Sequence, residues 1–158
     1  MSFYIESSHD EEVLEQCARM MSKSQPWITL KRGFNDCIEA LHGCDKEVYI
    51  IKCDGELLGF SALQMGGVFK GYIQSICIAT HVQGKGIGTA LLKFCEERIF
   101  KVSPNAFICV SSFNVDAARL YYRLGYKKIG ELTDFIVRGH DEFLLRKTVG
   151  PSSEFISV

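Results

Sequence analysis

This chain of 158 residues lacks the features that mark nucleic-acid-binding and membrane proteins. Lysine and arginine number 18 against 19 aspartates and glutamates, giving a formal net charge of -1, so no broad positive field exists to hold a nucleic acid by counterion release. Apolar runs such as Phe60–Leu63 are far shorter than the ~20 residues that a membrane-spanning helix needs. We therefore expect no nucleic-acid partner and no membrane partner.

Signals for export and for metal binding are also missing. The first residues, Met1–Glu6, contain no basic segment followed by a long apolar stretch, so we expect a cytoplasmic location. The cysteines form an odd set without a Cys-x-x-Cys pair, which argues against a disulfide framework and against a metal site. Most of them are expected to be reduced core residues. They are Cys17, Cys37, Cys44, Cys53, Cys77, Cys95 and Cys109.

Hydrophobic periodicity divides the rest of the chain into helices and strands. Four helices are expected. The first begins at the capping segment 8–12 and ends near residue 22, and the others cover 33–41, 87–98 and 114–124. Strands are expected over 3–5, 47–53, 57–65, 71–79, 106–110, 126–137 (with a break at 130) and 142–146. The order β-α-α-β-β-β-α-β-α-β-β predicts one mixed α/β domain over residues 1–149, followed by a flexible C-terminal tail, 150–158.

A glycine-rich segment follows the apolar strand 71–79. It is Gln83-Gly84-Lys85-Gly86-Ile87-Gly88-Thr89, and a helix takes over from it. Glycines let backbone N–H groups converge on one point, and a helix N-terminus adds further donors and a favourable dipole, so the segment favours phosphate binding. The only Gly-Lys pair is followed by Gly86 rather than Ser or Thr, and no G-x-G-x-x-G frame can be placed. The P-loop and the dinucleotide fingerprint are therefore disfavoured.

Two motifs resemble the signatures of a known family. Gln83, Gly86 and Gly88 match the pattern Arg or Gln, two residues, Gly, any residue, Gly or Ala. Downstream, Asn114–Tyr126 contains the Asn, Ala, Leu-Tyr and Leu-Gly-Tyr elements at the usual spacing. In this order the motifs resemble the GNAT superfamily of acyl-CoA-dependent N-acyltransferases, over residues 71–130.

The resemblance implies a GNAT-like fold with a mostly antiparallel central sheet flanked by helices. It also implies acetyl-CoA as the acyl donor, with its pyrophosphate on the backbone amides of the glycine-rich segment and its pantetheine arm along the strand end. Asn114 would bond to the pantetheine arm or brace the helix that follows. The implied cofactor-binding residues are Ile76, Cys77, Ile78, Gln83, Gly84, Lys85, Gly86, Ile87, Gly88, Thr89 and Asn114.

Tyr121 occupies the position of the family's general acid, and a phenol can return a proton to a thiolate of similar basicity. Tyr122 falls at a variable position of the pattern, so Tyr121 is preferred, with a packing role as the alternative. The resemblance supplies no general base, because Cys109 stands where some relatives carry Glu. A water chain, or an acceptor that arrives partly deprotonated, would serve equally well, and three candidate residues lie near the last hairpin. They are Glu131, Asp134 and His140.

The sequence thus predicts an N-acetyltransferase that joins the acetyl group of acetyl-CoA to a primary amine. A non-catalytic acyl-CoA-binding module of the same fold is the alternative, and so, more remotely, is another nucleotide-binding α/β enzyme. The acceptor is left open between a small molecule and a protein or peptide amine, and a homodimer is left open as well. Trp27 is interpreted as a packing residue, with acceptor contact as the alternative.

Overall fold

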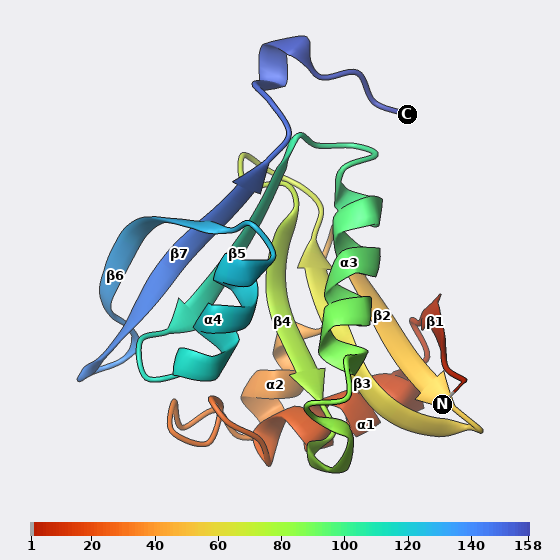
Figure 1. Cartoon of the computed structure of the whole chain (residues 1–158). Helices are drawn as coiled ribbons and strands as arrows, with labels where there is room; N and C mark the ends of the chain where they lie inside the picture. The colour runs from red at the N-terminus through yellow and green to blue at the C-terminus, as the bar shows by residue number, and fades with distance from the viewer. Residues whose placement is uncertain (1) are drawn as a thin grey trace.

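A computed structural model describes residues 2–158, which form one seven-stranded sheet with helices on both faces (Figure 1). The element order matches the predicted one. The strands are β1 (Tyr4–Ser7), β2 (Lys46–Cys53), β3 (Glu56–Gln64), β4 (Tyr72–Ile78), β5 (Asn105–Ser111), β6 (Lys127–Val137) and β7 (His140–Thr148). The helices are α1 (Glu11–Ser22), α2 (Phe34–Ala40), α3 (Ile87–Ile99) and α4 (Val115–Arg123), with short 3-10 turns η1 (Thr80–Val82) and η2 (Ser152–Glu154).

The sheet order is β1-β2-β3-β4-β5-β7-β6, and β4 with β5 is the parallel pair in an otherwise antiparallel sheet. The mostly antiparallel prediction is therefore confirmed. Two pairs of Cα partners join β4 to β5, Tyr72 with Phe107 and Ile73 with Ile108, and the strands then diverge (Figure 1). This divergence is the feature of the fold on which the site depends.

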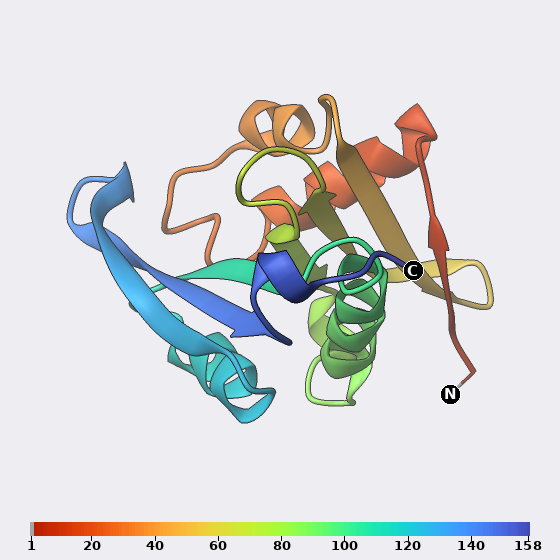
Figure 2. The ribbon, with the colours of Figure 1, turned by 90° about the horizontal axis from the view of Figure 1, so that it is seen from above.

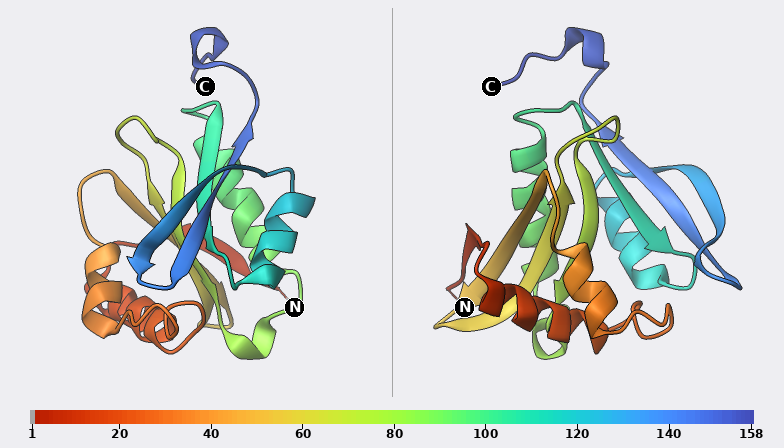
Figure 3. Two further views of the ribbon diagram at one scale, coloured as in Figure 1. Left: turned by 90° about the vertical axis from the view of Figure 1, so that its left-hand side faces the viewer. Right: turned by 180° about the vertical axis from the view of Figure 1, so that it is seen from behind.

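Two hydrophobic cores lie on opposite faces of the sheet. Along β2, Val48 and Ile50 pack under α1 and α2, whereas Tyr49 and Ile51 pack under α3, because successive side chains of a strand point to opposite faces. Figure 2 and the right-hand view of Figure 3 show α1 and α2 on one face, with α3 and α4 on the other. The central strands are covered on both sides by this arrangement, whereas β1 and β6 at the two edges are largely exposed.

Local signals explain several boundaries. The side chain of Asp10 accepts a hydrogen bond from the Val13 N–H and caps α1. Asp54 and Gly55 both have positive φ, 49° and 82°, as a two-residue hairpin turn between β2 and β3 requires. Both features agree with the prediction. No helix formed by residues 2–158 is long and apolar enough to span a membrane.

Some expectations need correction. The core prediction holds for four cysteines, Cys17, Cys37, Cys77 and Cys95, while Cys44 is exposed and Cys53 and Cys109 are half-buried. The expected last strands also shift by a few residues, because the buried Tyr126 precedes β6 rather than opening it. The flexibility of 150–158 stays a prediction.

Candidate active site

The C-terminal half of β4 has a free edge. Its other edge pairs with β3 up to Ile78, and the Ala79 N–H donates to the Leu58 carbonyl at 2.9 Å. In an antiparallel ladder the amides alternate in direction, so those of Ile76 and Ile78 face the β5 side. Within residues 2–158, the β5 register does not extend to either of them. Two backbone donors are therefore available inside the gap between the strands.

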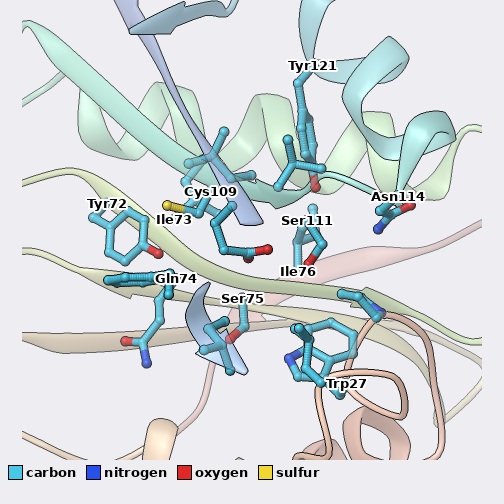
Figure 4. Close-up of a pocket in the computed structure, with 17 residues that line it drawn as sticks. Trp27, Tyr72, Ile73, Gln74, Ser75, Ile76, Cys109, Ser111, Asn114 and Tyr121 are labelled. Carbon is cyan, nitrogen blue, oxygen red and sulfur yellow. The ribbon is translucent and has the colours of Figure 1, made fainter. Parts of the chain in front are cut away.

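A cavity of about 100 Å³ opens in this gap, and we call it the splay cavity (Figure 4). The cavity is lined from both faces of the sheet. The segment between α1 and α2 contributes residues from one face, and helix α4 contributes Tyr121 from the other. Its walls are residues 72–76 of β4, residues 108–111 of β5, Pro26, Trp27, Leu30, Asn114, Tyr121, Phe135, Ile136 and Glu142.

A second cavity of about 270 Å³ adjoins the first on the α1–α2 face, and we call it the helix-side cavity. The two share Trp27, Tyr72, Gln74, Ser75, Phe135 and Ile136 as lining residues. The helix-side cavity adds Met21, Arg32, Asp36, Cys37 and Ala40. Trp27 packs against the core under α1 and α2, as predicted, and also lines both cavities, while its contact with an acceptor stays a prediction.

Tyr121 points from α4 into the splay cavity, with its ring edge-on to Tyr126 (Figure 4). Its side chain is 6% exposed, and burial raises the pKa of the phenol above its usual value. The group is therefore protonated at neutral pH and serves as a donor. The next residue, Tyr122, is 44% exposed on the outer surface of the same helix. The geometry agrees with the preference for Tyr121.

The glycine-rich segment connects the free end of β4 to the start of α3. Gly84 and Gly86 have φ of 74° and 83°, and a Cβ at either position would meet nothing within 4 Å. The Gln83 side-chain amide donates to the Ile78 carbonyl at 3.0 Å, which fixes the segment to the strand end. Ile87 is 2% exposed and packs into the core under α3, so its side chain is structural. The open surface over the glycines fits an approaching phosphate group.

The remaining predicted site residues divide into two groups. Ile76, Asn114 and Tyr121 line the splay cavity, whereas the Cys77 side chain is buried in the core under α1 and α2. Asn114 occupies the N-cap position of α4, but within residues 2–158 its side chain makes no capping hydrogen bond. The structure therefore gives no support to bracing of α4 through a capping bond, and the role of Asn114 stays a prediction.

The three candidates for the general base are not supported by their positions. The Asp134 carboxylate accepts a hydrogen bond from the Gly139 N–H at 2.7 Å in the hairpin turn, and Glu131 pairs with Lys128 on the surface. His140 stacks edge-on against Phe113. The residues that line the splay cavity, all within 2–158, include none of the three.

A different carboxylate, Glu142 on β7, lines the splay cavity. It pairs with Ser111 of β5 in the sheet register and is 5% exposed. Burial raises the pKa of its carboxyl, while the neighbouring Ser111 hydroxyl and His140 oppose the rise in part. The sequence carried a weak signal for it, an acidic residue directly before the apolar run Phe143–Leu145.

The comparisons with known proteins agree with this geometry. Residues 11–126 match the model of the acetyltransferase (GNAT) family. This chain belongs to the GNAT acetyltransferase family. It is 34% identical over 145 residues to a Methanocaldococcus jannaschii protein described as an uncharacterized N-acetyltransferase, covering 89% of this chain and 87% of that one. It is 26% identical over 121 residues to an N-alpha-acetyltransferase of Sulfurisphaera tokodaii, covering 68% and 72%.

A solved structure of an aminoglycoside 6'-N-acetyltransferase, complexed with coenzyme A, superposes with a TM-score of 0.74. The match covers 96% of this chain and 98% of that one at 14% identity, so it bears on the fold. As a GNAT acetyltransferase, this protein is an acyltransferase with a GNAT fold. The open space over Gly84 and Gly86 and the β4 amides that β5 does not pair fit an acyl-CoA, because phosphates and an extended arm both need close approach to the backbone.

Proposed function

We propose that this GNAT acetyltransferase transfers the acetyl group of acetyl-CoA to a primary amine by direct attack in a ternary complex. The observation that carries the proposal is the divergence of β4 from β5 after Ile73. It places free backbone donors on one side of the splay cavity and the protonated Tyr121 on the other. These are the groups that acyl transfer from a thioester needs.

Acetyl-CoA would bind along β4 and the glycine-rich segment. Its pyrophosphate would accept hydrogen bonds from the amides of residues 84–89, since the Gln83 N–H donates to the Thr80 carbonyl, with Lys85 adding a positive charge and Thr89 lying in the first turn of α3. The pantetheine arm would pair with the free edge at Ile76–Ile78 as an added strand. Asn114 is then free to bond to the arm, because its side chain does not cap α4 within residues 2–158.

The reaction would form a C–N bond and break a C–S bond. The neutral amine attacks the thioester carbonyl, and the Ile78 N–H stabilises the oxyanion of the tetrahedral intermediate. Collapse of the intermediate expels the coenzyme A thiolate, which takes the proton of the Tyr121 phenol. The nitrogen loses a proton in the same step, and this proton returns to the phenolate through solvent. The products are the amide and coenzyme A thiol.

The cysteines do not favour a covalent acyl-enzyme. Burial raises the pKa of the Cys77 thiol to about 12, and its side chain packs into the core under α1 and α2. Cys109 does line the splay cavity, but burial raises the pKa of its thiol as well. Both groups are neutral at pH 7, and the thiolate rather than the thiol is the nucleophile. Direct transfer is therefore the simpler route.

The test combines binding with turnover. Acetyl-CoA at 100 times its Kd should stabilise the protein by about 2.7 kcal/mol, measured as a rise in Tm. With a panel of primary amines, mass spectrometry should detect the acetylated amine and chromatography an equal amount of free coenzyme A. Stabilisation without turnover on the whole panel would favour the non-catalytic acyl-CoA-binding module. A dinucleotide that raises Tm where acetyl-CoA does not would overturn the proposal.

A further inference from the structure

Glu142 places an uncompensated carboxylate in the splay cavity. It is the one acidic residue that 2–158 contribute to the lining, and no lysine or arginine of that range lines the cavity with it. Its Oε2 atom is fully buried and has no hydrogen-bond partner among the described residues. The facing Ser111 Oγ is likewise buried without a partner in the same range. Within 2–158, the residues that line the cavity therefore give this carboxylate no lysine or arginine partner.

Such a group is costly for the folded protein. A buried charge without a partner and a buried acceptor without a hydrogen bond both destabilise the folded state. A ligand that brings a cation and hydrogen-bond donors would remove both costs. An alkylammonium group offers one positive charge and three N–H donors. The chemical complement of this part of the cavity is thus a protonated primary amine.

We propose that Glu142 binds the ammonium group of the acceptor and removes one of its protons before attack. This inference rests on the proposed acetyl transfer and names the group that prepares its nucleophile. The proton passes from the ammonium nitrogen to the Glu142 carboxylate, leaving a neutral amine with its lone pair free. After the amide has formed, the carboxyl proton is released to solvent and the cycle closes.

The surroundings of Glu142 suit a proton acceptor. Tyr72 of β4, Cys109 of β5 and Tyr121 of α4 face it across the cavity, and His140 lies two residues away on β7. Burial raises the pKa values of the Tyr72 and Tyr121 phenols and of the Cys109 thiol, so these three groups are neutral at pH 7. Burial also raises the pKa of the Glu142 carboxyl, which makes its carboxylate a stronger base than an exposed one.

The helix-side cavity indicates what the rest of the acceptor is like. The charged residues in its lining, Arg32 and Asp36, lie 4.0 Å apart as an ion pair, so their charges offset each other. Most of the other lining residues are apolar or aromatic, including Met21, Trp27 and Phe135. A second positive charge would find no free carboxylate in the part of this cavity that 2–158 form. The acceptor class is therefore a primary amine with one positive charge and an apolar tail.

The test uses two amines of the same shape and different basicity. 2-Phenylethylamine is protonated at pH 7, whereas 2,2-difluoro-2-phenylethylamine is largely neutral because the fluorines withdraw electrons. Glu142→Gln should lower kcat/KM for the first amine by about 10²-fold or more and for the second by less than tenfold. Glu142→Asp should recover part of the loss. Glu131→Gln, which removes an exposed carboxylate of the neighbouring strand, is the matched control and should change neither value.

The pH profile separates a base from a merely structural residue. For the wild-type protein with 2-phenylethylamine, kcat/KM should fall as the pH drops through the raised pKa of Glu142, because the carboxyl becomes protonated. In the Gln variant this decrease should be absent. Equal losses on both amines, an unchanged decrease at low pH, or spermidine as a better acceptor than 2-phenylethylamine would overturn the proposal.

Stability gives a second readout. Because the pKa of Glu142 is raised in the folded state, the wild type loses stability as the pH rises from the ordinary carboxyl value through the raised one. Glu142→Gln should therefore be at least as stable as the wild type at pH 7 by urea unfolding. A less stable Gln variant would mean that the carboxylate supports the fold, against the proposal. Acetyl-CoA should stabilise both proteins; a wild type that acetylates no amine would instead refute the proposed function.

Discussion

At the scale of single residues, adjacent side chains on α4 have opposite environments. Tyr121 is buried at the splay cavity, and Tyr122 is largely exposed, although both are tyrosines in the same motif. A helix turns by about 100° per residue, so neighbours cannot share a face. The difference provides a matched pair of variants for testing the proton donor.

Tyr121→Phe should lower kcat by about 10²-fold, because the coenzyme A thiolate loses its proton donor. Acetyl-CoA affinity should stay near the wild-type value, since the proposed cofactor contacts are made by the backbone of β4 and by the glycine-rich segment. Steady-state kinetics and isothermal titration measure the two quantities. Tyr122→Phe is the control and should match the wild type. Unchanged turnover in Tyr121→Phe would remove the residue as the acid.

The residues that the sequence could predict are those that belong to continuous motifs. Tyr121 and the segment 83–89 were identified from motifs with local spacing; Tyr121 lines the splay cavity and the segment follows the end of β4, while their roles stay predictions. Glu142 was missed because its location depends on the pairing of Ser111 with Glu142, between strands about thirty residues apart. Asp134 and Glu131 were considered because they lie near the last hairpin. In the structure each binds a local partner and does not line the splay cavity.

At the scale of elements, β4, the glycine-rich segment and α3 act as one unit. The Gln83 amide bonds the Ile78 carbonyl, and Gly86 occupies the N-cap position of α3 with a φ of 83°. An L residue with a branched side chain is strained in this left-handed region. The direction of the amides at the helix start therefore depends on glycine at this position.

Gly86→Val should abolish acetyl-CoA binding and lower the free energy of unfolding by about 1–3 kcal/mol. The physical cause is the branched side chain at positive φ, which forces the backbone of the segment to shift. Titration calorimetry and urea unfolding measure the two effects. Gly33→Ala is the control, because Gly33 caps α2 with a φ of -79° and has open space around its Cβ position. Wild-type affinity in Gly86→Val would refute the backbone phosphate site.

The order of elements followed from hydrophobic periodicity and turn residues, which act over short distances. The divergence of β4 from β5 did not, because both strands read as apolar along their whole length. Their pairing stops after Ile73 and Ile108, and no local pattern marks that point. The two cavities, which arise where the strands separate, could therefore not be predicted from the sequence.

At the scale of the whole molecule, the divergence divides the sheet into two parts joined by little backbone pairing. The strands β1–β4 form one part, and β5, β7 and β6 form the other. Lys147 of β7 donates to Glu96 of α3 at 2.7 Å, and the Glu96 side chain is 9% exposed. Because α3 packs on β3 and β4, this ion pair connects the two parts.

Lys147→Met should lower the free energy of unfolding by about 3 kcal/mol, because it leaves the buried Glu96 carboxylate without its partner while keeping an apolar side chain. Arg19→Met is the control: it removes an exposed ion pair with Glu15 on α1 and should cost less than about 1 kcal/mol. Urea unfolding monitored by circular dichroism measures both. Similar values for the two variants would show that the Lys147–Glu96 pair contributes little to the connection.

The opening between β4 and β5 can be approached from both faces of the sheet. Trp27 reaches it from the α1–α2 side and Tyr121 from the α4 side. A thioester and an amine approaching from opposite sides would meet in the plane of the sheet itself. Neither would have to leave before the other enters, and the amide and the free thiol would have separate exits.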